Sequence, residues 1–208
     1  LDYLRQALTI NLELGDQRTT SFNNSNIGVA YFEMGAYDEA LDYLQRGLQL
    51  KLELKMHLTI GFNYGYMVMC QADQGAYAAV LQTAMTHFQQ HQTIEFDHAT
   101  GLVHLALAQT LAAREAGHPW TATMHTLLAS ITALTQLPAT PTAYFETALE
   151  TTRQHVLIHT LIAYAQFLMQ SDQPEAARTR LQAAKEIAVA AKLPQKLSRI
   201  ENLFKALG

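Results

Sequence analysis

Two pairs of histidines stand at a spacing that could assemble a metal site. His87 and His91, and again His155 and His159, are four residues apart, which places both imidazoles of a pair on one face of a helix. Two further candidate ligands follow the first pair, Glu95 and His98. No glutamate directly follows His87, so the His-Glu-x-x-His pattern of metalloproteases is absent, and nine histidines produce such spacings by chance. We therefore predict hydrogen-bonded or solvated histidines and no metal, with metal ligation as the alternative.

No other arrangement of reactive side chains has a supporting context. The sequence contains no phosphate-binding loop, no Gly-x-Ser-x-Gly turn and no close Cys/His or paired-carboxylate pattern. The one cysteine, Cys70, lies in the apolar run 66–70, where thiols are usually inert. A single cysteine forms no internal disulfide, which fits a reducing, cytoplasmic compartment. We expect neither enzymatic activity nor a cofactor.

The charge balance argues against two large classes of partner. The chain of 208 residues has a net charge of -4, and only 15% of its residues are charged. This is too little positive charge to follow a phosphate backbone, so we expect no nucleic-acid partner. No apolar stretch approaches the roughly 20 residues that span a bilayer, and the start has no signal-peptide pattern, so we expect no membrane partner.

Helices must position whatever site the chain carries, because the sequence lacks the sustained alternation typical of strands. The clearest apolar periodicity predicts one helix over about 18–34 and a second that begins at Tyr37. Gly35 between them suits the left-handed conformation that ends many helices, since it has no Cβ. Further helices are predicted at 58–74, 77–90, 120–135 and 142–170, the last with a break near Thr152. Pro194 begins a short helix that we expect to cap the stack with a polar face toward water.

These helices follow a repeat of forty residues. Leu1-Asp2-Tyr3-Leu4 returns as Leu41-Asp42-Tyr43-Leu44, and Gly35-Ala36-Tyr37 returns as Gly75-Ala76-Tyr77. A fixed period of this size is typical of stacked-repeat proteins, in which each unit buries its apolar face on its neighbour. The repeat is regular through two units, weakens in the third and is broken at Leu137–Pro141. Because the chain opens in the middle of a unit, we expect it to be a piece of a longer protein.

The segment Asn26–Leu41 resembles the tetratricopeptide repeat, whose pattern is Leu-Gly-x-x-Tyr followed by Gly-x-Tyr-x-x-Ala. Six residues occupy the places of that pattern: Ile27, Gly28, Tyr31, Gly35, Tyr37 and Ala40. The resemblance implies an all-α fold, a superhelix (α-solenoid) of antiparallel helical hairpins with a C-terminal capping helix. The family's usual unit has 34 residues. The longer unit here resembles those of bacterial signalling and transcription regulators.

Periodicity and resemblance together divide the chain into the successive units of one domain. We expect a partial repeat at 1–16, repeats at 17–56 and 57–96, a degenerate repeat at 97–136, an irregular insertion at 137–156, a degenerate repeat at 157–193 and the capping helix at 194–208.

In this family, fixed positions of each unit's first helix line a concave groove, and the resemblance transfers those positions to this chain. The residues so implied to contact a partner are Phe22, Ser25, Asn26, Val29, Phe32, Glu33, Phe62, Tyr66, Met69, Asp73, Gln109, His159 and Gln166. They are mostly neutral and lack the Lys and Arg with which some relatives hold a terminal carboxylate. For Asn26, a partner contact and a local bond within the superhelix stay equally open.

The main hypothesis is a protein-interaction scaffold that holds a partner peptide, or another domain of its own polypeptide, in this groove. Apolar anchors would supply affinity, and amides would pair with the partner's backbone. One alternative is a regulatory sensor that binds a small molecule in the groove or in a pocket at 136–156. Another is a structural module that forms a homodimer through the exposed N-terminal edge.

Overall fold

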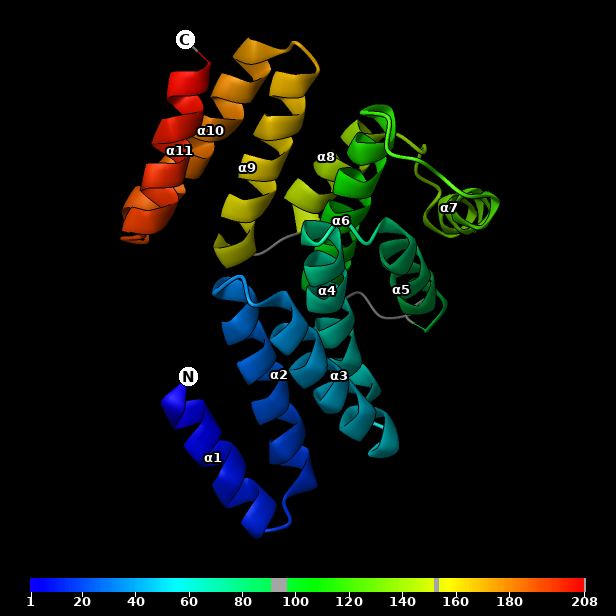
Figure 1. The fold of residues 1–208 in the computed structure, drawn as a ribbon, viewed down its shortest axis with the longest axis vertical. Coiled ribbons are helices and arrows are strands. Elements are labelled where there is room, and N and C mark those ends of the chain that lie inside the picture. The colour runs from blue at the N-terminus through cyan, green and yellow to red at the C-terminus, as the bar shows by residue number, and fades with distance from the viewer. Residues whose placement is uncertain (91–96, 152–153, 208) are drawn as a thin grey trace.

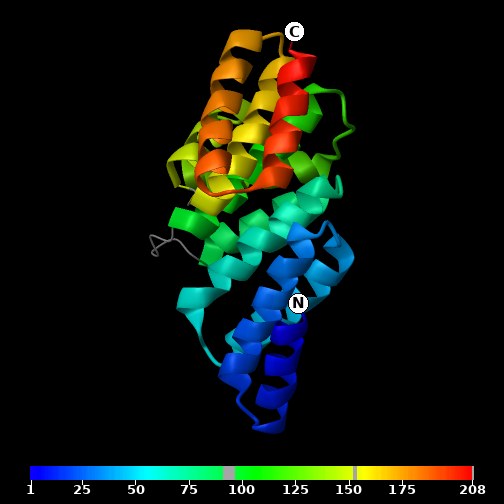
Figure 2. The same ribbon diagram turned by 90° about the vertical axis from the view of Figure 1, so that its left-hand side faces the viewer.

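The computed structural model describes residues 1–90, 97–151 and 154–207, without the side chains of 97–99, 154 and 155, and this part contains helices and no strand (Figure 1). The helices are α1 (Asp2–Glu13), α2 (Gln17–Glu33), α3 (Tyr37–Glu53), α4 (His57–Asp73), α5 (Tyr77–Gln90), α6 (Asp97–Glu115), α7 (Ala122–Thr135), α8 (Pro141–Thr151), α9 (Gln154–Gln170), α10 (Pro174–Ala190) and α11 (Pro194–Ala206). Both views show an elongated stack with the N-terminal helices at one end and the C-terminal helices at the other (Figure 2). The predicted all-α solenoid of helical hairpins is confirmed.

Local sequence signals set the ends of the helices. The side chain of Asp16 accepts a 3.0 Å hydrogen bond from the backbone N–H of Thr19 and so caps the start of α2. Gly35 has the predicted left-handed conformation, with φ of +76°, and ends the turn between α2 and α3. Lys55 takes the same conformation, with φ of 55°, at the place that Gly15 occupies forty residues earlier. The turn geometry of the repeat therefore persists where its glycine does not.

Small residues let the first hairpin close tightly. Ala40 and Leu44 of α3 are fully buried against α2. A Cβ added to Gly28 would lie 2.7 Å from Leu44 Cγ and 3.0 Å from the Ala40 carbonyl oxygen. The hairpin α4/α5 and the hairpin α9/α10 pack in the same antiparallel manner.

The third hairpin differs from the prediction. The helix expected at 120–135 is present as α7, but it packs against α5, and α6 pairs closely with α8 (Figure 1). The helical pattern predicted from residue 142 is present as α8, so the stretch 137–156, which we also expected to be an irregular insertion, contains the helix that covers α6. Tyr144, with 0% of its surface exposed, faces α6, where its ring centroid lies 5.8 Å from that of His104. Phe145, 1% exposed, stacks on Tyr164 of α9 with centroids 4.7 Å apart.

The N-terminal helix is the least covered element of the described chain. None of the residues of α1 is buried, and three of its large apolar side chains are exposed, at 87% for Tyr3, 54% for Ile10 and 61% for Leu12. Self-association through this edge stays a prediction. Among the described helices, none is long and apolar enough to cross a membrane.

We predict that Gly28→Ala destabilises the protein, although alanine normally favours a helix by about 1 kcal/mol over glycine. The new methyl group would press on Leu44 and on the backbone of Ala40. Overpacking of this kind costs about 1–3 kcal/mol. Urea unfolding should show a net loss of about 1 kcal/mol. The exposed Gln45→Ala of α3 serves as control, with an expected change within about 0.5 kcal/mol. A gain of stability in Gly28→Ala would contradict close packing at this crossing.

Candidate functional site

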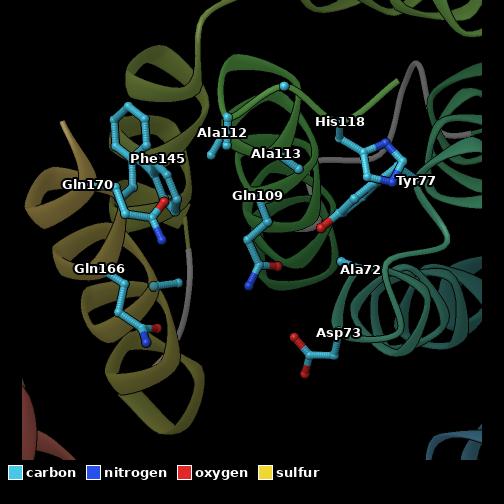
Figure 3. Close-up of a pocket in the computed structure, with 14 residues that line it drawn as sticks. Ala72, Asp73, Tyr77, Gln109, Ala112, Ala113, His118, Phe145, Gln166 and Gln170 are labelled. Atoms are coloured by element: carbon cyan, nitrogen blue, oxygen red, sulfur yellow. The ribbon is translucent and has the colours of Figure 1, made fainter. Parts of the chain in front are cut away.

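A hollow of about 630 Å³ opens on the inner side of the stack, where the ends of α4, α6 and α9 come together (Figure 3). Three glutamines line it, Gln109 of α6 and Gln166 and Gln170 of α9, and we call it the amide pocket. Alanines form much of the remaining wall: Ala72, Ala112, Ala113, Ala116 and Ala163. Phe145 and Phe167 close one side. Asp73 supplies a carboxylate and His118 an imidazole, and the other side chains of the described lining are uncharged.

Three residues predicted from different repeat units meet in this pocket. Asp73, Gln109 and Gln166 all line it, and Figure 3 shows them around the same open space. Each belongs to the first helix of its hairpin, so stacking of the hairpins brings residues together that are far apart in the sequence. The hydroxyl of Tyr37 donates a 3.0 Å hydrogen bond to Asp73 Oδ2, which fixes that carboxylate at the edge of the pocket.

Two more predicted residues, Glu33 and His159, join opposite ends of the chain. Lys196 of α11 donates a 2.9 Å hydrogen bond to His159 Nε2, because an ammonium group has no acceptor and the imidazole must accept. The Lys196 ammonium also lies 3.6 Å from Glu33 Oε2, and Glu33 Oε1 lies 3.6 Å from His159 Nε2. We call these three residues the α2–α9–α11 junction. The expectation that α11 turns its polar side to water is therefore wrong for Lys196.

Four of the predicted partner contacts are buried. Ser25, Phe32, Tyr66 and Met69 expose 1%, 7%, 2% and 2% of their surfaces. Phe32 packs edge-on against Tyr66, with ring centroids 5.6 Å apart, and lies 6.1 Å from the His159 ring. These four side chains therefore belong to the packed interior of the stack and not to its exposed surface. Of the other predicted residues, Asn26 is exposed, and Val29 is half-buried.

Phe22 and Phe62, also predicted to face a partner, cover a buried lysine that the sequence analysis missed. Lys51 of α3 is 1% exposed, and its ammonium lies 5.1 Å and 5.6 Å from the centroids of the two rings. It donates hydrogen bonds to Asn63 Oδ1 at 2.7 Å and to Ser25 Oγ at 3.0 Å. No carboxylate of the described residues pairs with it. Burial lowers the pKa of Lys51 to about 8.

Glycine makes room for this polar cluster. A Cβ at Gly47 would lie 2.6 Å from Ser25 Oγ and 2.9 Å from the Ser21 carbonyl oxygen. A signal was present in the sequence, because Lys51 lies seven residues after Leu44 and three after Leu48, on the same buried stripe. A lysine at such a position must find hydrogen-bond partners inside the protein.

The predicted histidine pairs fall partly on residues outside the described part. His91 and Glu95 belong to the stretch 91–96, and the side chains of His98 and His155 are not among those described. His87 is buried beside Tyr64 and Phe88, with ring centroids at 6.2 Å and 5.3 Å. Within the described residues, no three His, Cys, Asp or Glu side chains gather as a metal site would require.

We predict that burial of Lys51 makes stability rise with pH in the mildly alkaline range. The folded pKa of about 8 lies below the ordinary value near 10.5, so the folded state loses this proton first. Between these two pH values the unfolded state binds more protons, and the free energy of unfolding must increase with pH. Relative to Lys51→Met, the wild type should gain on the order of 3 kcal/mol from pH 8 to 10.5. Urea unfolding of both proteins across this range measures the difference. A constant difference would contradict a charged, buried Lys51.

We predict that the charge of Glu33 stabilises the α2–α9–α11 junction at neutral pH only. Contact with His159, whose Nε2 lies 3.6 Å from Glu33 Oε1, and the charge of Lys196 lower the pKa of Glu33 below its ordinary value of 4.5. A lowered carboxyl pKa stabilises the fold above the unfolded pKa, and this contribution is lost as pH falls through the folded pKa. Glu33→Gln should therefore cost about 0.2–1 kcal/mol at pH 7, the range of partly exposed ion pairs, and nothing at pH 2. Thermal unfolding at both pH values tests this, with the exposed Glu201→Gln of α11 as control. An equal cost of Glu33→Gln at both would rule out a charge effect.

Comparison with known proteins matches one unit of the stack to a family model. Residues 25–51, which span most of α2 and α3, match the family model of the tetratricopeptide repeat. No curated protein matches the chain. Tetratricopeptide repeats generally bind other proteins and typically act as scaffolds without enzymatic activity. With the helical hairpins of the described residues, this match fits a repeat protein of the tetratricopeptide type.

Proposed function

We propose that this chain is a protein-interaction module whose amide pocket holds an extended segment of a partner protein. The observation that carries the proposal is the side-chain carbonyl of Gln109, whose Oε1 is buried and lacks a hydrogen-bond partner. A buried acceptor without a partner costs about 1–3 kcal/mol. A backbone N–H of a bound segment would remove this cost.

The rest of the pocket suits a main chain better than a bulky side chain. An extended segment presents both N–H and C=O groups, and the amides of Gln166 and Gln170 can donate to one and accept from the other. The alanine wall leaves room for a backbone to approach α6 and α9 closely. Phe145 and Phe167, which are 1% and 9% exposed, make one side of the pocket apolar, and this suits an apolar side chain of that segment.

Charge defines the partner further. Asp73 stands at one edge of the pocket, and Arg199 of α11 donates a 3.4 Å hydrogen bond to Gln166 Oε1 at another. Neither edge carries a cluster of one sign, so a neutral segment fits better than a strongly acidic one. A segment of the same polypeptide meets these requirements as well as a separate protein does. The forty-residue unit resembles those of bacterial signalling and transcription regulators, and this resemblance supports a bound segment that comes from the same polypeptide.

We predict that peptides bind in the amide pocket through hydrogen bonds to Gln109 and Gln166. A phage-displayed library of random twelve-residue peptides, selected on the purified chain, should yield neutral sequences that bind it. Gln109→Leu combined with Gln166→Leu should weaken these peptides about 10- to 100-fold, because each lost hydrogen bond is worth roughly a factor of 3–10. Calorimetry on synthetic peptides measures the affinities.

The matched control is Gln45→Leu, at an exposed position of α3 outside the pocket, which should leave binding unchanged. Circular dichroism should be the same in all variants, and the double variant should melt no lower than the wild type, because Gln109→Leu removes the unpaired buried acceptor. The proposal is wrong if no peptide is enriched. It is equally wrong if the selected peptides bind the double variant as tightly as they bind the wild type.

A further inference from the structure

A second hollow results from the displaced position of α7. Because α7 packs against α5 and α8 covers α6, a space of about 530 Å³ opens between these four helices. Its described walls are mostly apolar: Phe88 of α5, Ala133 and Leu134 of α7, and Leu137 of the following loop. Its polar members are His104 of α6, Thr135 of α7 and Thr147 of α8. We call it the His104 pocket.

His104 is the unusual member of this wall. Only 5% of its surface is exposed, and its Nδ1 is buried with no hydrogen-bond partner. Phe88 and Tyr144 hold the imidazole in place, with ring centroids 5.6 Å and 5.8 Å away. Burial lowers the pKa of His104 to about 4, so the ring is neutral at ordinary pH. Buried polar atoms of proteins almost always have a partner, and an exception calls for an explanation.

Neither threonine donates a hydrogen bond to Nδ1, because the hydroxyl proton of each is used elsewhere. Thr147 Oγ1 donates to the Ala143 carbonyl at 2.9 Å, and Thr135 Oγ1 donates to the Ile131 carbonyl at 3.0 Å. The Tyr144 hydroxyl lies 3.2 Å from Thr135 Oγ1. Since the Thr135 proton goes to Ile131, Thr135 Oγ1 accepts from the Tyr144 hydroxyl, and it also accepts from the Leu137 N–H at 3.4 Å. Acceptor capacity therefore remains at Thr147 Oγ1. The described wall therefore combines an apolar surface, one imidazole with an unpartnered Nδ1 and one hydroxyl acceptor, and none of its residues carries a charge.

We propose that the His104 pocket binds a small uncharged molecule with an apolar body and a hydroxyl group that hydrogen-bonds to His104. Pockets of 300–1,000 Å³ with apolar walls and a few polar groups are typical small-molecule sites. A hydroxyl both donates and accepts, so it pairs with either tautomer of a neutral imidazole. A carboxylate or ammonium group is excluded because nothing in the described wall compensates its charge. This site is separate from the amide pocket and does not depend on peptide binding there.

Phenol is the probe, and two related molecules serve as comparison ligands. Benzene lacks the hydroxyl group, and benzoate carries a negative charge. Titrations of the isotope-labelled chain, followed by amide and methyl NMR shifts, give affinity and location together. Phenol should bind in the millimolar range and shift signals of residues around Leu134 and Thr147. Benzene should bind about 3- to 10-fold more weakly, the effect of one lost hydrogen bond. Benzoate should not bind.

His104→Phe removes both ring nitrogens and keeps an aromatic ring. It should weaken phenol about 3- to 10-fold, to the level of benzene, and leave benzene itself unchanged. The matched control is His57→Phe, at an exposed position of α4, which should change neither affinity. A second variant, Leu134→Trp, fills the pocket from a partly exposed position and should abolish binding of both probes even if His104→Phe fails to fold.

Three results would overturn the proposal. Phenol and benzene could bind the wild type equally, which would remove the role of the hydroxyl. Phenol binding could survive Leu134→Trp unchanged, which would place it outside the pocket. Phenol could bind a folded His104→Phe as tightly as the wild type, which would show that His104 does not contact the ligand.

Discussion

The burial of α6 is the constraint on which the rest of the structure depends. Its residues from Leu102 to Ala108 are all buried, so this helix needs neighbours on nearly every side. α4 covers one side and α8 another, and α9 makes a smaller contact. A surface helix such as α7, whose exposed residues include Leu134, could not provide this cover as well as α8, which buries Tyr144 and Phe145. The choice of α8 displaces α7 onto α5, and the His104 pocket is the space that remains between them.

The local features of the fold could be predicted from the sequence, because they depend on residues close together in the chain. The apolar spacing around Ile27 and Tyr31 placed α2 within one residue of its observed ends, and Gly35 marked its termination. The pairing of α6 could not be predicted in this way. Both α7 and α8 have apolar stripes, and only the three-dimensional competition for the surface of α6 decides between them. A forty-residue period gives the order of the helices and does not give their partners.

The candidate site was predictable to a similar extent. Repeat position alone brought Asp73, Gln109 and Gln166 into one pocket, because equivalent positions of stacked units face the same side. Repeat position did not reveal that Ser25 lies in a buried network with Lys51, since that depends on the space left by Gly47. Repeat position also did not reveal that Glu33 approaches Lys196 across the stack. These two residues lie 163 positions apart in the sequence. The contact joins α2 to α11 across the stack, and no short window of sequence encodes it.

The two pockets have different chemistry because they use different sides of the same helix. Gln109 and His104 are five residues apart on α6, which separates their directions by roughly 140° around the helix axis. On one side, the regular stacking of first helices brings amides from α6 and α9 together around a wall of alanines. On the other, the displaced α7 leaves aromatic and aliphatic side chains around one imidazole. The regular side offers hydrogen bonds that suit any polypeptide backbone, whereas the irregular side offers one buried nitrogen at a fixed position, which selects for the shape and polarity of a small molecule.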